Sequence, residues 1–245
     1  MPSPSARSPI HVATPAAQTR ARPAVEYRIR PSDPGAHLFA LSCSVPDPDP
    51  AGQVFSLPAW IPGSYMIREF ARNIVRLGAD ADGQPCAIDK LDKHTWRAAV
   101  PAGARVLTVH YEVYAWDLSV RSAHLDTTHA FFNGSSVFLA VAGRTAAPCV
   151  VTIERPVGDA FRDWKLITTL PAEHGRPGGP CHFGRFRAAD YDELIDHPVE
   201  MGQFTRARFT AAGVPHDIAL TGRHDCDLER LCADLERICA WQIAL

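Results

Sequence analysis

The segment Val25-Glu-Tyr-Arg-Ile-Arg30 alternates apolar and polar residues, and this alternation decides the class of fold. Successive side chains of a β-strand point to opposite faces, so a two-residue period predicts a strand with one buried face. Ala36–Val45 forms a second predicted strand and ends at the proline-rich run 46–50, which cannot supply ladder donors. The first part of the chain is therefore predicted to consist of β-strands.

Further short stretches of the same kind follow, separated by turn signals such as Asp82-Gly83 and Asn133-Gly134. Many short strands at hairpin-like spacing favour a sandwich or an open barrel over βαβ units. The predicted strands are Gln53–Leu57, Asn73–Leu77, Thr95–Val100, Arg105–Tyr114, Ser136–Val141, Cys149–Glu154, Trp164–Thr168, Arg206–Thr210 and Asp217–Leu220.

The two ends of the chain differ from this pattern. Residues 1–24 are rich in proline and alanine and lack a continuous apolar core, which predicts a disordered tail and not a secretory signal peptide. At the other end, Leu228, Leu231, Leu235 and Ile238 follow a three-four spacing that predicts a helix, with Asp225 or Asp227 as its N-cap. No stop signal follows this helix, so we expect it to pack against sequence beyond the chain.

Composition excludes several classes of partner. A net charge of −2 provides no long-range attraction to nucleic acid or to an anionic membrane. No apolar run approaches the roughly 20 residues needed to cross a bilayer. The seven cysteines include no Cys-x-x-Cys pair, and we interpret them as small buried side chains in a reducing, cytoplasmic protein.

Three segments carry more information than composition does. The first, Leu57–Asn73, contains Pro62-Gly63, a pair typical of a type II turn. Its aromatic residues Trp60, Tyr65 and Phe70 are predicted to anchor that turn against the body of the domain. This pattern favours a structural corner over a binding site.

The second segment, residues 114–136, holds His124, Asp126 and His129. Their offsets of two and three fit neither one face of a strand nor a helical pair of histidines. We therefore interpret them as hydrogen-bonded loop residues, and the sequence predicts no metal ligand in this chain.

The third segment, Ala189–Phe204, is acidic. Asp190 or Asp192 is predicted to cap a short helix that ends at His197-Pro198, because a residue before proline resists the helical conformation. Clustered carboxylates of this kind form either a solvated face or an anionic pocket for an amine. The segment alone does not choose between them.

Together the three phrases LPAWIPGSYMIREFARN, RSAHLDTTHAFFNGSSVFL and AADYDELIDHPVEMG resemble the N-terminal domain of the glycyl aminopeptidase family, zinc metallopeptidases with a C-terminal PDZ domain. The resemblance runs from about Tyr27 to the end of the chain. It implies a mainly β fold, a large β-sandwich or saddle-like sheet domain with a C-terminal α-helix. The implied division is a tail over 1–24, a β-domain over 25–224, and the first helix of a truncated catalytic domain over 225–245.

Members of that family release N-terminal residues such as Gly or Ala, using a His-Glu-x-x-His helix that binds zinc. This chain has no such sequence, so the resemblance implies no catalytic residue and no cofactor here, and zinc only in the full-length protein. The implied partners are the chain's own missing catalytic domain and a peptide substrate. The alternative is a stand-alone β-sandwich module that binds a peptide or a glycan.

An amino-end peptidase must hold the free ammonium group of its substrate, and a carboxylate offsets the desolvation of that charge. Glu200 is our first candidate for this role, since Pro198 fixes the chain before it and Gly202 permits close approach after it. Asp126 is the second, and a surface acid paired with an arginine is the competing interpretation. Neighbouring polar residues in the same two segments complete the predicted substrate-facing set, Asn133 and Tyr191.

Overall fold

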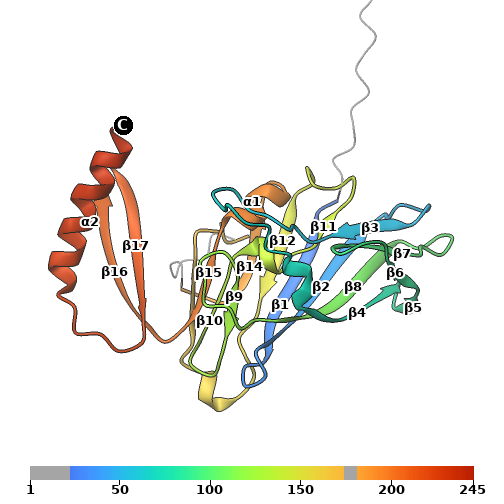
Figure 1. Cartoon of the computed structure of the whole chain (residues 1–245), viewed down its shortest axis with the longest axis horizontal. Helices are drawn as coiled ribbons and strands as arrows, with labels where there is room; N and C mark the ends of the chain where they lie inside the picture. The colour runs from blue at the N-terminus through green and yellow to red at the C-terminus, as the bar shows by residue number, and fades with distance from the viewer. Residues whose placement is uncertain (1–22, 174–180) are drawn as a thin grey trace, which may run out of the picture.

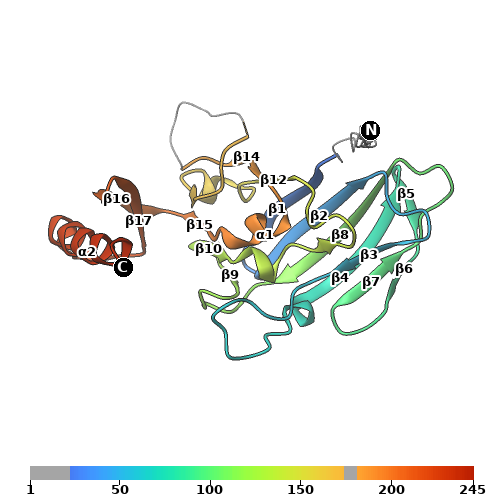
Figure 2. The same cartoon turned by 90° about the horizontal axis from the view of Figure 1, so that it is seen from above.

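A computed structural model describes residues 23–173 and 181–245, so most of the predicted tail lies outside the described residues. Its largest element is a seven-stranded sheet (Figures 1 and 2) in the order β14-β12-β1-β2-β8-β4-β5. Only the β1–β12 contact in this sheet is parallel. The strands are β1 (Val25–Asp33), β2 (Leu38–Pro46), β4 (Ile74–Ala81), β5 (Gln84–Cys86), β8 (Val106–Tyr114), β12 (Cys149–Ile153) and β14 (Gly184–Ala188). The predicted mainly β class is confirmed.

Two four-stranded sheets complete the body of the molecule. One has the order β11-β3-β7-β6 and the other the order β13-β15-β10-β9. Buried residues from all three sheets, among them Ile29, Phe55 and Phe132, form one continuous core. The strands are β3 (Gln53–Ser56), β6 (Ile88–Lys90), β7 (Thr95–Ala98), β9 (Ala123–Leu125), β10 (His129–Phe132), β11 (Ala140–Val141), β13 (Lys165–Thr168) and β15 (Val199–Gly202).

The core contains an irregular segment that the sequence had suggested was a strand. Ser136–Val141 was predicted as one strand, but only Ala140–Val141 pairs as β11, after the short 3-10 helix η2 (Gly134–Ser136). The preceding carbonyls of Val137, Phe138 and Leu139 instead accept hydrogen bonds from three buried tyrosine hydroxyls, those of Tyr111, Tyr191 and Tyr27 respectively. Side chains thus satisfy buried backbone groups that a ladder would otherwise have to satisfy. Burial raises the pKa of all three tyrosines.

The short elements agree in part with expectation. Helix α1 (Tyr191–Asp196) is capped by the Asp190 carboxylate, which accepts from the Glu193 amide, and it ends at His197 as predicted. Two further 3-10 helices are η1 (Phe70–Asn73) and η3 (Asp159–Phe161). Among the described residues, no helix is long and apolar enough to cross a membrane.

The loop before η1 departs from the prediction. Phe70 is buried and anchors it, and Gly63 has the positive φ of +77° that the predicted turn requires. Tyr65, however, is fully exposed, and the half-exposed Trp60 donates its indole N–H to the Ser64 carbonyl of the same loop. The predicted aromatic anchor is therefore wrong for Tyr65. The tip of the loop presents apolar side chains to solvent.

The C-terminal residues form a separate unit, which we call the C-terminal unit (residues 204–245). Strands β16 (Phe204–Ala211) and β17 (Val214–Thr221) form a hairpin sheet of their own, and α2 (Leu228–Ile243) packs along β16. Figure 1 shows this unit projecting from one end of the body. Asp227 caps α2 by accepting from the Arg230 amide, and no residue of this helix is buried.

Candidate functional site

His124, Asp126 and His129, which were predicted to be loop residues, come together in a β-hairpin. His124 lies on β9, His129 begins β10, and Asp126 stands in the connecting turn. Their sequence offsets did not fit a single strand because the two histidines belong to two strands. One ring nitrogen of each histidine and one carboxylate oxygen of Asp126 all lie within 4.8 Å of one another.

The sheet β13-β15-β10-β9 has one apolar face and one polar face. The two-residue period points Phe132, Met201 and Leu166 into the core, where each is fully buried. The register places Phe131 opposite both His124 and Glu200, so these three side chains share the other face with His129. We call this the polar face. It carries two of the predicted substrate-facing residues, since Glu200 lies on it and Asp126 at its end.

Asp126 is fixed by its own turn. Its Oδ1 accepts hydrogen bonds from the Thr128 amide, the Thr128 hydroxyl and the His129 amide, an Asx-type arrangement. Burial alone would raise the pKa of Asp126, but these hydrogen bonds outweigh burial and hold the pKa well below its usual range. The other oxygen, Oδ2, lies 3.3 Å from His124 Nε2. Asp126 is therefore an ionised carboxylate with one committed oxygen and one more weakly held.

Glu200 is held by the neighbouring strand and by the C-terminal unit. Its Oε1 lies 3.2 Å from His129 Nδ1 and accepts a hydrogen bond of 2.7 Å from the Thr221 hydroxyl. The bond to Glu200 raises the pKa of His129, against the opposing effect of burial. Gly202 makes this approach possible, because a Cβ there would lie 3.0 Å from the His129 Cβ. The group that lies against Gly202 is His129, and the predicted approach of a substrate amine stays a prediction.

The two histidines are part of a ring stack. The ring centroids of His124 and His129 are 4.8 Å apart, and Trp116 stacks on the other side of His124 at 5.0 Å. The His124 side chain is only 7% exposed. Its Nδ1 is buried and has no hydrogen-bond partner in the described part of the chain. The stack shields His124 from solvent while His129 stays at the edge of the polar face.

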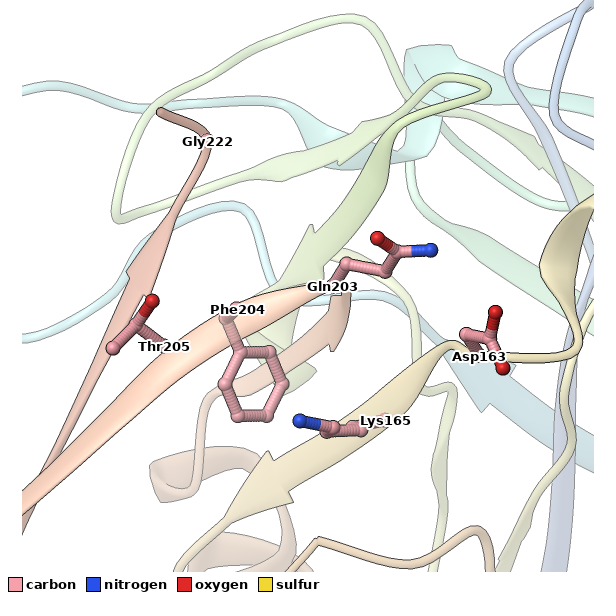
Figure 3. A pocket seen from close by; sticks show the side chains of 6 residues that line it. All are labelled: Asp163, Lys165, Gln203, Phe204, Thr205 and Gly222. Atoms are coloured by element: carbon pink, nitrogen blue, oxygen red, sulfur yellow. The ribbon is translucent and has the colours of Figure 1, made fainter. Parts of the chain in front are cut away.

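Two open cavities adjoin the polar face where the body meets the C-terminal unit. One, of about 760 Å³, is lined by residues that include Thr128, His129, Trp164 and Thr221. The other, of about 400 Å³, is drawn in Figure 3, where the Lys165 side chain extends toward the Phe204 ring. The Lys165 ammonium lies 5.8 Å from that ring's centroid, within range of a cation–π contact. His129 thus lines solvent-accessible space, and the Glu200 carboxylate beside it is partly exposed.

The other two predicted site residues have roles in the scaffold. Tyr191 is buried, and its hydroxyl is committed to the Phe138 carbonyl. Asn133 caps η2, with its Oδ1 accepting from the backbone and side chain of Ser135. Neither side chain shares the polar face with Glu200.

The fold and the site together define a class of protein: a β-domain in which one small sheet presents a polar, partly buried face. The sequence matches the family model of the Peptidase M61 N-terminal domain over residues 26–203. The chain belongs to this family. The family match ends one residue before β16, the first element of the C-terminal unit.

Solved structures agree with this assignment. An aminopeptidase N family protein from Idiomarina loihiensis is 41% identical, with a TM-score of 0.83 over 90% of this chain and 36% of its own. This chain therefore spans about a third of that protein's length. An M1 zinc metallopeptidase variant from Deinococcus radiodurans, bound to a Tyr-Ser-Ala substrate, shares the fold at 10% identity. Its TM-score is 0.50 over 90% of this chain and 52% of its own. Among curated proteins, none matches the chain.

Proposed function

We propose that this chain is the non-catalytic N-terminal domain of a metalloaminopeptidase, and that it shapes the substrate cleft of a hydrolase releasing N-terminal residues such as Gly or Ala. The observation that carries the proposal is that Glu200 and Asp126 both contact His129, which lines an open cavity at the polar face. Family membership supports the domain assignment. The chain has no His-Glu-x-x-His, so we place no catalytic zinc on it.

Glu200 is the residue we propose for the substrate's ammonium group. Both of its hydrogen bonds fall on Oε1, which leaves Oε2 as the oxygen to meet a positive charge. Its side chain is 19% exposed, so the carboxylate is partly desolvated yet reachable. A charge pair in such surroundings is stronger than one at an open surface. The arginine-paired interpretation is not supported, because the partners of Glu200 are a histidine and a threonine.

The partners that we propose are the remainder of the longer protein and a peptide. The match to a relative about two and a half times as long supports a further, catalytic domain in the longer protein. Apolar side chains exposed on the loop at Tyr65, Met66 and Ile67 and on α2 at Ile238 and Trp241 are suited to cover by that domain. All seven cysteines are free, which fits the cytoplasmic location that we propose.

The decisive experiment uses the Idiomarina loihiensis relative, which is long enough to include further domains. Replacing its counterpart of Glu200 by Gln should lower kcat/KM for peptides with a free amino end by about tenfold, equivalent to about 1.4 kcal/mol. The matched control replaces the counterpart of Glu112, an acid paired with Arg76 on the seven-stranded sheet, and should leave kcat/KM unchanged. Equal kinetics for both variants would remove Glu200 from the site.

The same proposal makes a statement about the isolated chain. It should cleave neither glycyl nor alanyl p-nitroanilide, because it lacks the residues that activate water in this family. Chelator-sensitive turnover by the purified chain would contradict the non-catalytic role. Saturable binding of peptides or glycans without turnover would instead favour the stand-alone binding module.

A further inference from the structure

We propose that His124, Asp126 and His129 form a non-catalytic binding site for a divalent transition-metal ion, with Zn²⁺ as the best chemical match. The site lies in the β9–β10 hairpin and adjoins the polar face, because Asp126 belongs to both and Glu200 contacts His129. Two imidazoles and one carboxylate are a donor set that zinc accepts, with a fourth position open to water. No catalytic role is assigned to the ion.

The geometry of the three donors supports the proposal. In a tetrahedral zinc site with bonds of about 2 Å, neighbouring ligand atoms stand roughly 3.3 Å apart. His124 Nε2 and Asp126 Oδ2 are already 3.3 Å apart, and all three donors lie within 4.8 Å. A small closing movement of His129 toward the other two residues would complete the site.

Neighbouring residues hold Asp126 and His129 in orientations that leave one ligand atom of each free to bind an ion. The bonds from Thr128 and His129 hold Asp126 through Oδ1, which leaves Oδ2 for an ion. Glu200 holds His129 through Nδ1, which leaves Nε2. A carboxylate behind a ligating histidine is a common arrangement in zinc sites, because it orients the ring and raises its basicity. Each donor is thus oriented by a partner on its far side.

His124 supplies a second, independent observation. Its ring is almost fully buried. In the described part of the chain, the donor nitrogen Nε2 makes one long contact, 3.3 Å to Asp126 Oδ2, and the other ring nitrogen, Nδ1, has no partner. A buried ring so poorly satisfied is unfavourable, and coordination of an ion by Nε2 would replace its long contact to Asp126 with a stronger bond. Trp116 covers the outer face of this ring and would exclude competing water.

Other histidine–carboxylate pairs in the molecule provide the contrast. His110 Nε2 lies 2.7 Å from Asp80 Oδ2 on the seven-stranded sheet, with a 60% exposed ring. Within the described residues, the hairpin is the one place where a third donor joins such a pair. The exposed His110–Asp80 pair is therefore a matched control for simple surface binding of metal.

The experiment titrates the full chain, without an affinity tag, with Zn²⁺ by calorimetry and with Co²⁺ by visible absorption. We expect one equivalent of ion to bind. Asp126→Asn keeps an acceptor for the turn but removes the charge, and His129→Gln removes a ring, so each should weaken binding about tenfold or more. His110→Gln should bind as the unaltered chain does. Absence of one-to-one binding, or equal affinity in all three variants, would overturn the site.

A second measurement covers the case in which these variants fail to fold. In the unaltered chain, Co²⁺ should shift the ring proton signals of two of the eleven histidines, and these should be His124 and His129. Signals of other histidines shifted in their place would overturn the proposal. Because neither measurement depends on turnover, its failure is distinguishable from failure of the proposed peptidase role.

Discussion

The body of the molecule and the C-terminal unit are both β-structures, yet they are stabilised differently. In the body, β8 alternates buried and exposed side chains along its whole length and contributes to a continuous core. In the C-terminal unit, β17 has no buried side chain and α2 has none either. The same two-residue period therefore produces a buried core in the body, whereas in the C-terminal unit it leaves the hairpin and the helix largely exposed. We propose that the unit, unlike the body, packs against a further part of a longer protein.

This contrast also bears on where the domain ends. The sequence placed the boundary at 224/225, before the predicted helix. The hairpin pairs with itself and packs with α2, and the family match stops at Gln203. We therefore propose that the boundary lies at 203/204, which assigns the hairpin and the helix together to the following domain.

The largest effect should come from the core of the body. Phe132→Ala removes a fully buried ring on β10 and should lower the free energy of unfolding by about 3–5 kcal/mol. Leu231→Ala on α2 removes a half-exposed side chain and should change it by less than about 1 kcal/mol. Urea denaturation followed by tryptophan fluorescence measures both. Similar losses in the two variants would contradict the division into a body and a dependent unit.

The next largest effect on stability is expected from a glycine substitution in the body, compared with one in the C-terminal unit. Gly202→Ala places a Cβ 3.0 Å from the His129 Cβ at a φ of +146°, so it should destabilise the body by about 1–3 kcal/mol. Gly213 in the β16–β17 turn also has a positive φ, but open space surrounds it. Gly213→Ala should leave the main thermal transition unchanged, because the strain falls in the unit and not in the body. Scanning calorimetry distinguishes the two.

Most of the fold could be predicted because burial imposes a period on the sequence. Five strands of the seven-stranded sheet (β1, β2, β4, β8 and β12) and the caps at Asp190 and Asp227 follow from local patterns, whereas the edge strands β5 and β14 were not predicted. The β9–β10 hairpin did not, because its strands are only three and four residues long and their polar face carries histidines. The usable signal was the spacing of Ala123 and Leu125 against Ala130 and Phe132, two short apolar pairs flanking a turn.

The site was harder to predict for the same reason. Glu200 and Asp126 were found as isolated polar residues in acidic or polar segments, and a pairing register across three strands was needed to place them together. Tyr191 shows the opposite error. A polar residue next to a candidate site was assigned to it, whereas its hydroxyl satisfies a buried carbonyl that only the tertiary fold reveals.

A pH-dependent effect should arise at the junction of the two regions. The hydrogen bond to Glu200 raises the pKa of His129, so its stabilisation is full below the unfolded histidine value of about 6.5 and is lost as the pH rises through the folded pKa. Glu200→Gln should therefore reduce the free energy of unfolding at pH 6, by about 1 kcal/mol or less, and have little effect at pH 9. Glu112→Gln is the control. Glu112 pairs with Arg76, which stays charged at both pH values, so this variant should show no such pH dependence. Urea denaturation of the three proteins at both pH values measures this, and an effect of Glu200→Gln that is equal at both would contradict the assigned pair.

The smallest effect is expected from removing the C-terminal unit itself. Among the described residues, deleting 204–245 takes away the hydrogen bond from Thr221 to Glu200, the contact between Lys165 and the Phe204 ring, and little of the buried core. The melting temperature of the remaining body should shift by less than about 4 °C, the change that roughly 1 kcal/mol produces in a domain of this size. Solubility should rise, because the exposed Ile238 and Trp241 are lost.

Deleting only 226–245 provides the internal comparison. This shorter deletion uncovers the face of β16 on which α2 packs, so the protein should aggregate more than after the longer deletion. Light scattering and thermal melts of both truncations measure these differences. A large fall in melting temperature for the longer deletion would show that the unit belongs to the core of the body.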